Sequence, residues 1–114
     1  MFEYSESQMV GYADLNLPAL MVGGVMRYIM DGITPGSFLL AVVSNDLREA
    51  CARADPDNAA RLVDYVFFLH NYAPPQCFGN PDRACDWIEA GGLNGLEAAK
   101  IAKLPPVDPA RGAA

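Results

Sequence analysis

Apolar residues recur with helical spacing in four segments of the chain, and no segment alternates long enough to predict a strand. The predicted helices span residues 18–31, 35–54, 56–72 and 81–90. A weaker helical pattern follows in "LNGLEAAKIAKL". The sequence therefore predicts an all-α fold, a compact bundle of four main helices with short capped turns.

Two of the predicted helices carry a clear apolar stripe. In the first, the stripe consists of Val22, Val25, Met26 and Ile29. In the second, three- and four-residue steps join Leu40, Val43, Leu47, Ala50, Cys51 and Ala54. Stripes with this spacing are typical of helices that bury one face in a core. We therefore expect both stripes to be buried.

The second half of the third helix, "LVDYVFFLH", is apolar nearly all round. A helix of this kind lies centrally in a core, or contributes to an interface as well as to the core. We therefore expect a homo-oligomer, with "VDYVFF" and the first helix as interface candidates.

A capping residue followed by proline recurs three times, in Thr34-Pro35, Asp55-Pro56 and Asn80-Pro81. The side-chain oxygen of such a residue accepts a hydrogen bond from a free amide of the first turn, and proline at the first helical position loses no needed donor. We expect each pair to begin a helix.

The ends of the chain have weaker patterns. Residues 1–15 show no clean period and are compatible with an arm, a short helix or disorder. We assign residues 1–16 to a flexible N-terminal arm, 17–104 to a single helical domain, and the proline- and alanine-rich residues 105–114 to a disordered tail.

Composition narrows the classes of partner. The net charge of -6 argues against a protein that binds duplex nucleic acid, although six arginines leave room for a local basic pocket. No segment reaches the roughly 18 apolar residues that a membrane span needs. Three cysteines, an odd number, without a secretory signal indicate a cytoplasmic protein with reduced thiols and no membrane partner.

Three constellations could carry chemistry, and each is incomplete. His70, Cys77 and Cys85 lack the spacing of a zinc site, so we expect no metal and no cofactor. His70 and Cys77 could form a nucleophile and base, but without the third group of a triad. Asp46 and Glu49 lie one turn apart and could share acid–base work. We expect Cys51 and Cys85 to be small buried apolar residues.

A binding pocket is the sharper hypothesis. Arginine forks grip phosphate or carboxylate, aromatic rings stack on a base, and asparagine amides read its polar edge. The candidate ligand-binding residues are Asn45, Arg48, Arg53, Arg61, His70, Asn71, Tyr72 and Phe78. Such a pocket would be of nucleotide size, and it could form between subunits. For the charged stretch around Asp46 and Glu49, a solvated helix face with a capped turn is the favoured interpretation.

The elements "GITPGSFL", "NDL", "RAD", "HNYAPPQCFGNP" and "DWI" occur in this order within residues 28–88. This pattern resembles a family of small accessory proteins encoded by tailed phages and prophages. The chain departs from the family where proline becomes Thr34, where Ser-Pro becomes Asn80-Pro81, and where a frequent tryptophan becomes Phe78. The resemblance implies a phage accessory protein in the host cytoplasm and implies no particular activity.

We therefore expect a non-enzymatic binding protein that counters a host defence system. It would bind a host defence protein or sequester a small signalling nucleotide. Two alternatives stay open: a small hydrolase acting on a nucleotide-like ligand, and a virion or assembly accessory protein.

Overall fold

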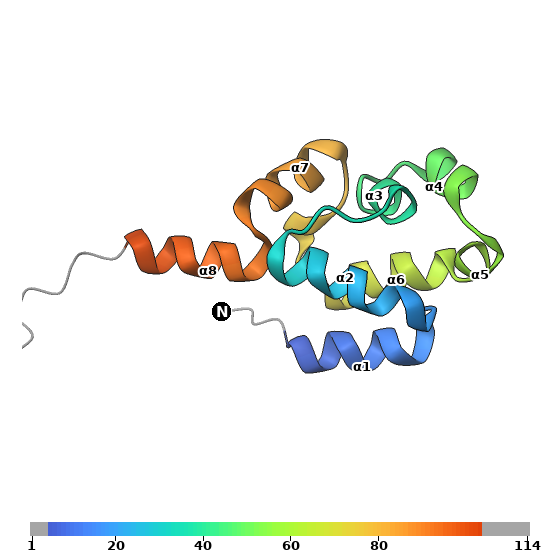
Figure 1. The fold of residues 1–114 in the computed structure, drawn as a ribbon, viewed down its shortest axis with the longest axis horizontal. Helices are drawn as coiled ribbons and strands as arrows, with labels where there is room; N and C mark the ends of the chain where they lie inside the picture. The colour runs from blue at the N-terminus through green and yellow to red at the C-terminus, as the bar shows by residue number, and fades with distance from the viewer. Residues whose placement is uncertain (1–4, 104–114) are drawn as a thin grey trace, which may run out of the picture.

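The computed structural model describes residues 5–103, and within them the fold is all-α with no strand (Figure 1). The expected helical fold class is confirmed. The helices are shorter and more numerous than the four predicted. They are α1 (Glu6–Asn16), α2 (Ala19–Asp31), α3 (Ser37–Val43), α4 (Leu47–Arg53), α5 (Pro56–Ala60), α6 (Leu62–Tyr72), the 3₁₀ turn η1 (Pro75–Cys77), α7 (Pro81–Ala90) and α8 (Gly92–Lys103).

Helix α1 corrects the expectation of a flexible arm over residues 1–16. Ser5 caps its N-terminus by accepting a hydrogen bond from the Gln8 amide at 3.2 Å. Met9 and Ala13 are buried, and the helix packs along α2 and α6 (Figure 1). Residues 6–16 therefore belong to the helical body. The expected tail at 105–114 lies outside the described residues.

Helix α2 follows the predicted pattern closely. Val25, Met26 and Ile29 are buried, and Val22 packs at the edge of the core. The helix stops where expected, because Gly32 adopts the left-handed conformation with φ of 66°. Glycine takes this conformation without the steric cost that a Cβ atom imposes.

The predicted helix over residues 35–54 is broken in its middle. Asn45 has φ of 60°, a conformation that Asn tolerates better than most residues, and the Asp46 side chain then caps α4 by accepting from the Glu49 amide at 3.1 Å. The break rotates α4 relative to α3. As a result the predicted continuous stripe divides, with Val43 and Ala50 buried but Leu47 66% exposed.

The predicted helix over residues 56–72 is also broken, at Arg61, whose backbone angles are φ -109° and ψ 10°. The capping predictions were correct at two of three positions. Asp55 accepts from the Asn58 amide at 2.7 Å, and Asn80 accepts from the Arg83 amide at 2.8 Å. The prediction at Thr34 was wrong, because Gly36 is the N-cap of α3 and the helix begins at Ser37 instead of Pro35.

Hydrogen bonds in the core join segments that lie far apart in the sequence. The Tyr28 hydroxyl donates to the Cys77 carbonyl at 2.6 Å, and the Trp87 indole donates to the Tyr28 carbonyl at 2.9 Å. The Tyr65 hydroxyl donates to Asn58 Oδ1 at 2.6 Å. These bonds give partners to buried polar groups, which would otherwise destabilise the folded state.

Glycines allow the backbones of α2, α7 and α8 to pack in direct contact. Gly91 and Gly92 both have positive φ, 81° and 68°, at the joint between α7 and α8. A Cβ atom on Gly92 would lie 2.6 Å from the Gly32 nitrogen. Helix α8 leaves this joint and extends away from the other helices (Figure 1). No helix within residues 5–103 is long and apolar enough to cross a membrane.

Candidate functional site

The eight residues predicted to bind a ligand do not converge on one place in the single chain. Asn45 precedes α4, Arg48 and Arg53 lie on it, and Arg61 lies just before α6. The remaining four lie at the other end of α6 or after it. Because α6 has 11 residues and rises about 1.5 Å per residue, Arg61 and Tyr72 are separated by about 16 Å along the helix. Phe78 lies nearer the first group, because the amide of the next residue, Gly79, donates to the Val43 carbonyl at 2.8 Å.

Two of the three candidate arginines are paired with carboxylates of their own helices. Arg53 Nε lies 2.7 Å from Glu49 Oε1, and Arg61 Nη1 lies 3.3 Å from Asp64 Oδ2. Both pairs are exposed, and exposed pairs of this kind contribute little to stability. They show that α4 and α6 balance their charges locally. Arg48 is exposed.

The second group is largely engaged in contacts within the chain. Asn71 Nδ2 donates to the Phe67 carbonyl at 2.9 Å. The Tyr72 ring stacks on Tyr12, with ring centroids 4.7 Å apart. Phe78 is half-buried against the core. His70 is exposed in the last turn of α6, where a cation is favoured by the helix dipole.

The cysteines behave differently from expectation. Cys51 and Cys85 are exposed, whereas Cys77 is buried. Burial raises the pKa of the Cys77 thiol to about 12. A nucleophilic cysteine needs accessible thiolate, so the pairing of His70 with Cys77 as base and nucleophile loses its chemical basis.

The carboxylates of Asp46 and Glu49 are both engaged in contacts within α4. Asp46 caps α4, and Glu49 pairs with Arg53. Asp46 is exposed and Glu49 is half-exposed, and only Asp46 borders a pocket, so the two carboxylates do not share the enclosed site that paired acid–base work requires. Among residues 5–103, no cluster of three histidine, cysteine or acidic side chains could hold a metal ion.

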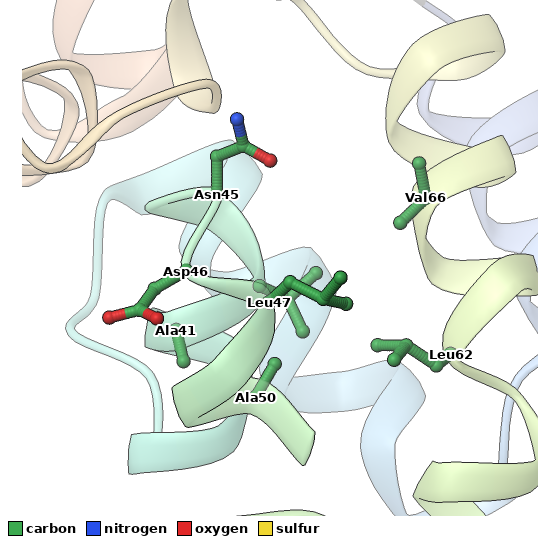
Figure 2. A pocket seen from close by; sticks show the side chains of 8 residues that line it. Ala41, Asn45, Asp46, Leu47, Ala50, Leu62 and Val66 are labelled. Atoms are coloured by element: carbon green, nitrogen blue, oxygen red, sulfur yellow. The ribbon is translucent and has the colours of Figure 1, made fainter. Parts of the chain in front are cut away.

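A small apolar pocket lies between α4 and α6 and has a volume of about 40 Å³ (Figure 2). Leu47 reaches from α4 toward Leu62 and Val66, which project from α6. Ligand sites for drug-sized molecules usually occupy at least about 300 Å³, so this pocket suits one apolar side chain rather than a nucleotide. The lining residues are Ala41, Val42, Asn45, Asp46, Leu47, Ala50, Leu62 and Val66.

Two larger hollows lie elsewhere on the surface. One, of about 430 Å³, is bordered by Glu6, Ser7, Val10 and Gly11 on α1. The other, of about 340 Å³, is bordered by Pro75, Gln76, Arg83 and Asp86 beside α7. None of the eight predicted ligand residues lines either hollow.

Large apolar side chains are exposed around the α4–α6 pocket. At its mouth, Leu47 is 66% exposed and Val66 is 54% exposed. Further along α6, Val63 is 80% exposed and Phe67 is 50% exposed. The apolar character of "VDYVFF" indicated these α6 residues from the sequence. Leu47 was missed, because the stripe over residues 35–54 placed it in the core. The capping residues "SND" were the available signal of the break that exposes it.

No protein-family model, curated protein or solved structure matches this chain.

Proposed function

We propose that this protein acts by binding another protein and catalyses no reaction. Its binding site is the α4–α6 surface, which we define as the pocket of Figure 2 together with Leu47 and Val66 at its mouth. The observation that carries this proposal is the exposure of two large apolar side chains around an apolar pocket. Such groupings are typical of interaction sites.

The proposed occupant is an apolar side chain of a partner whose surrounding surface is basic. The lining residues Ala41, Ala50 and Leu62 supply apolar contact for such a side chain. Asp46 lies on the rim and the exposed Arg48 follows it on α4, so the preference for a basic partner rests on the net charge of -6 of the whole chain. Complementary charge speeds encounter and selects partners, so a basic partner surface fits best.

The resemblance to tailed-phage accessory proteins supports a host defence protein as that partner. Sequestration of a nucleotide-derived signal has less support, because Arg61 and Tyr72 lie at opposite ends of α6 and Arg53 is paired with Glu49. Hydrolysis also has less support, because Cys77 is buried and Asp46 caps a helix.

The test begins with a photo-crosslinking amino acid at position 47, expressed in the cells that normally contain the protein. Position 20 is the matched control, because Leu20 is also an exposed leucine, 97% exposed, at the start of α2. We expect one specific protein to be captured from position 47 and not from position 20. The captured protein is then purified and mixed with wild type or with Leu47→Glu.

We expect Leu47→Glu to weaken this reconstituted complex by about 30-fold or more, the loss typical of an interface hot spot. The control Leu20→Glu should bind as wild type does. The proposal is wrong if both crosslinking positions capture the same proteins, or if the purified partner binds Leu47→Glu with wild-type affinity.

A further inference from the structure

The hollow beside α7, of about 340 Å³, is bordered by groups of several chemical kinds. Its border combines an apolar ring, an amide, a cation and an anion, from Pro75, Gln76, Arg83 and Asp86. The volume lies within the range of small-molecule sites, which begins at about 300 Å³. The two charged residues belong to one helix, α7, and are three positions apart. A space of small-molecule size therefore has both signs of charge on its border.

Arg83 and Asp86 have the spacing of an ion pair but do not form one. Arg61 and Asp64 have the same spacing of three positions, and Arg61 Nη1 lies 3.3 Å from Asp64 Oδ2. Residues at this spacing are neighbours on a helix, where opposite charges attract. Among residues 5–103, no ion pair includes Arg83 or Asp86. The cation and the anion therefore border the hollow without neutralising each other.

The Arg83 side chain is directed toward the loop before α7. Its Nη1 donates to the Pro75 and Phe78 carbonyls, both at 3.4 Å. Gly79 leaves the space for this path, because a Cβ atom there would lie 3.0 Å from Nη1. A guanidinium has five N–H donors, and no hydrogen bond within the described chain uses Nε or Nη2 of Arg83. Arg83 is thus oriented before a ligand arrives, which lowers the cost of binding.

The two charges together select a ligand that carries both signs. A guanidinium binds carboxylate through paired hydrogen bonds, and a carboxylate accepts hydrogen bonds from an ammonium group. An anion alone would meet Asp86 and the net charge of -6, and a cation alone would leave Arg83 without a partner. An α-amino acid carries its carboxylate and its ammonium group on one carbon atom, so it meets both requirements. The Pro75 ring offers an apolar wall for its side chain.

We propose that the hollow beside α7 binds a free α-amino acid with an apolar side chain. Arg83 donates to the carboxylate, Asp86 accepts from the ammonium group, and the side chain of the ligand rests on Pro75. Because these three residues are exposed, we expect a dissociation constant on the order of millimolar. The site goes beyond the proposed function and does not depend on it, since none of its border residues lines the α4–α6 pocket.

Titration of the isotope-labelled protein with L-valine, followed by NMR of the backbone amides, tests the site. We expect shifts concentrated in η1 and the first two turns of α7. N-acetyl-L-valine lacks the ammonium group and L-valinamide lacks the carboxylate, so each should bind about fivefold more weakly or less. The proposal is overturned if L-valine moves no signal in this region at its highest soluble concentration, or if all three ligands bind equally.

Asp86→Asn tests the anion with little risk to the fold, because Asp86 is exposed and joins no ion pair among residues 5–103. Asparagine keeps the shape of the side chain and loses the charge, so L-valine should bind about fivefold more weakly. Asp82→Asn is the matched control, because Asp82 is an exposed carboxylate of the same helix that does not border the hollow. It should bind L-valine as wild type does. Equal affinities of Asp86→Asn and wild type would overturn the proposal.

The two proposals are tested through different residues and fail separately. Leu47→Glu should lose the partner of the α4–α6 surface and bind L-valine as wild type does. Asp86→Asn should bind that partner with wild-type affinity. A protein that captures one specific partner through position 47 and does not respond to L-valine would overturn the amino acid site alone.

Discussion

The junction of α2, α7 and α8 and the outer side of α6 use their side chains in opposite ways. At the junction, Gly32 and Gly92 let two backbone segments approach closely. The Trp87 indole and the Tyr28 hydroxyl each donate a hydrogen bond to a backbone carbonyl. On the outer side of α6, Val63 is 80% exposed, and Phe67 stays 50% exposed although its ring stacks on Tyr12. The groups at the junction have their contacts within the chain, whereas the outer side of α6 leaves apolar surface exposed.

This difference separates folding from binding within one small molecule. Substitutions at the junction should lower the free energy of unfolding, because each contact there is made within the chain. Substitutions of the exposed Val63 on the outer side of α6 should have little effect on folding. Substitutions of Leu47 should change binding of the proposed partner, also with little effect on folding. The predictions that follow run from the largest expected effect on stability to the smallest.

Gly32→Ala should destabilise the protein most. Its φ of 66° strains any Cβ-bearing residue, and the added Cβ would lie 2.7 Å from the Gly92 nitrogen. We expect the free energy of unfolding to fall by about 3 kcal/mol or more, measured by urea denaturation.

Gly11→Ala is the matched control, because it lies within α1 with nothing inside 4 Å of the new Cβ atom. It should stabilise by up to about 1 kcal/mol. Equal effects of the two substitutions would contradict the close backbone approach.

The second largest effect should come from raising the pH, which should lower the free energy of unfolding. Burial raises the pKa of Cys77 from 9.0 to about 12, so the thiol ionises more readily in the unfolded chain. The stability that it contributes is complete below pH 9 and is lost as the pH rises toward 12. We expect the free energy of unfolding to be lower at pH 10 than at pH 8 by about 1 kcal/mol from Cys77.

Burial also raises the pKa of Tyr28 and Tyr65, which lose stability in the same direction at higher pH. Cys77→Ala is the informative variant. It should be less stable than wild type at pH 8 and should show a smaller decrease between pH 8 and pH 10. An unchanged slope would mean that Cys77 is not the titrating group.

The sequence predicted the elements whose signals are local. Helix α2 ends at the predicted residue 31, the stripe through Val25 and Ile29 is buried, and Asp55 and Asn80 cap their helices. These features depend on residues within a few positions of one another. Local chemistry is therefore enough to locate them.

The errors arose where two local signals competed or where a distant contact decided the outcome. Thr34-Pro35 had the pattern of a cap, but Gly36 stays extended and the helix begins at Ser37. Helix α1 was missed because its apolar residues fall on several faces, and packing against α2 and α6 stabilises it. The predicted ligand pocket depended on which ends of the helices meet. That is a property of the whole fold, which no single turn encodes.

The central claim is that the exposed apolar residues of the α4–α6 surface serve binding and not folding, and Leu47→Glu tests it most directly. Leu and Glu have similar helix propensities, so the exposure of position 47 decides the result. Urea unfolding measures the stability of this variant, and titration with the partner captured through position 47 measures its binding. We predict an unfolding free energy within about 0.5 kcal/mol of wild type together with weakened binding. A loss of more than about 1 kcal/mol in stability with unchanged binding would contradict the account.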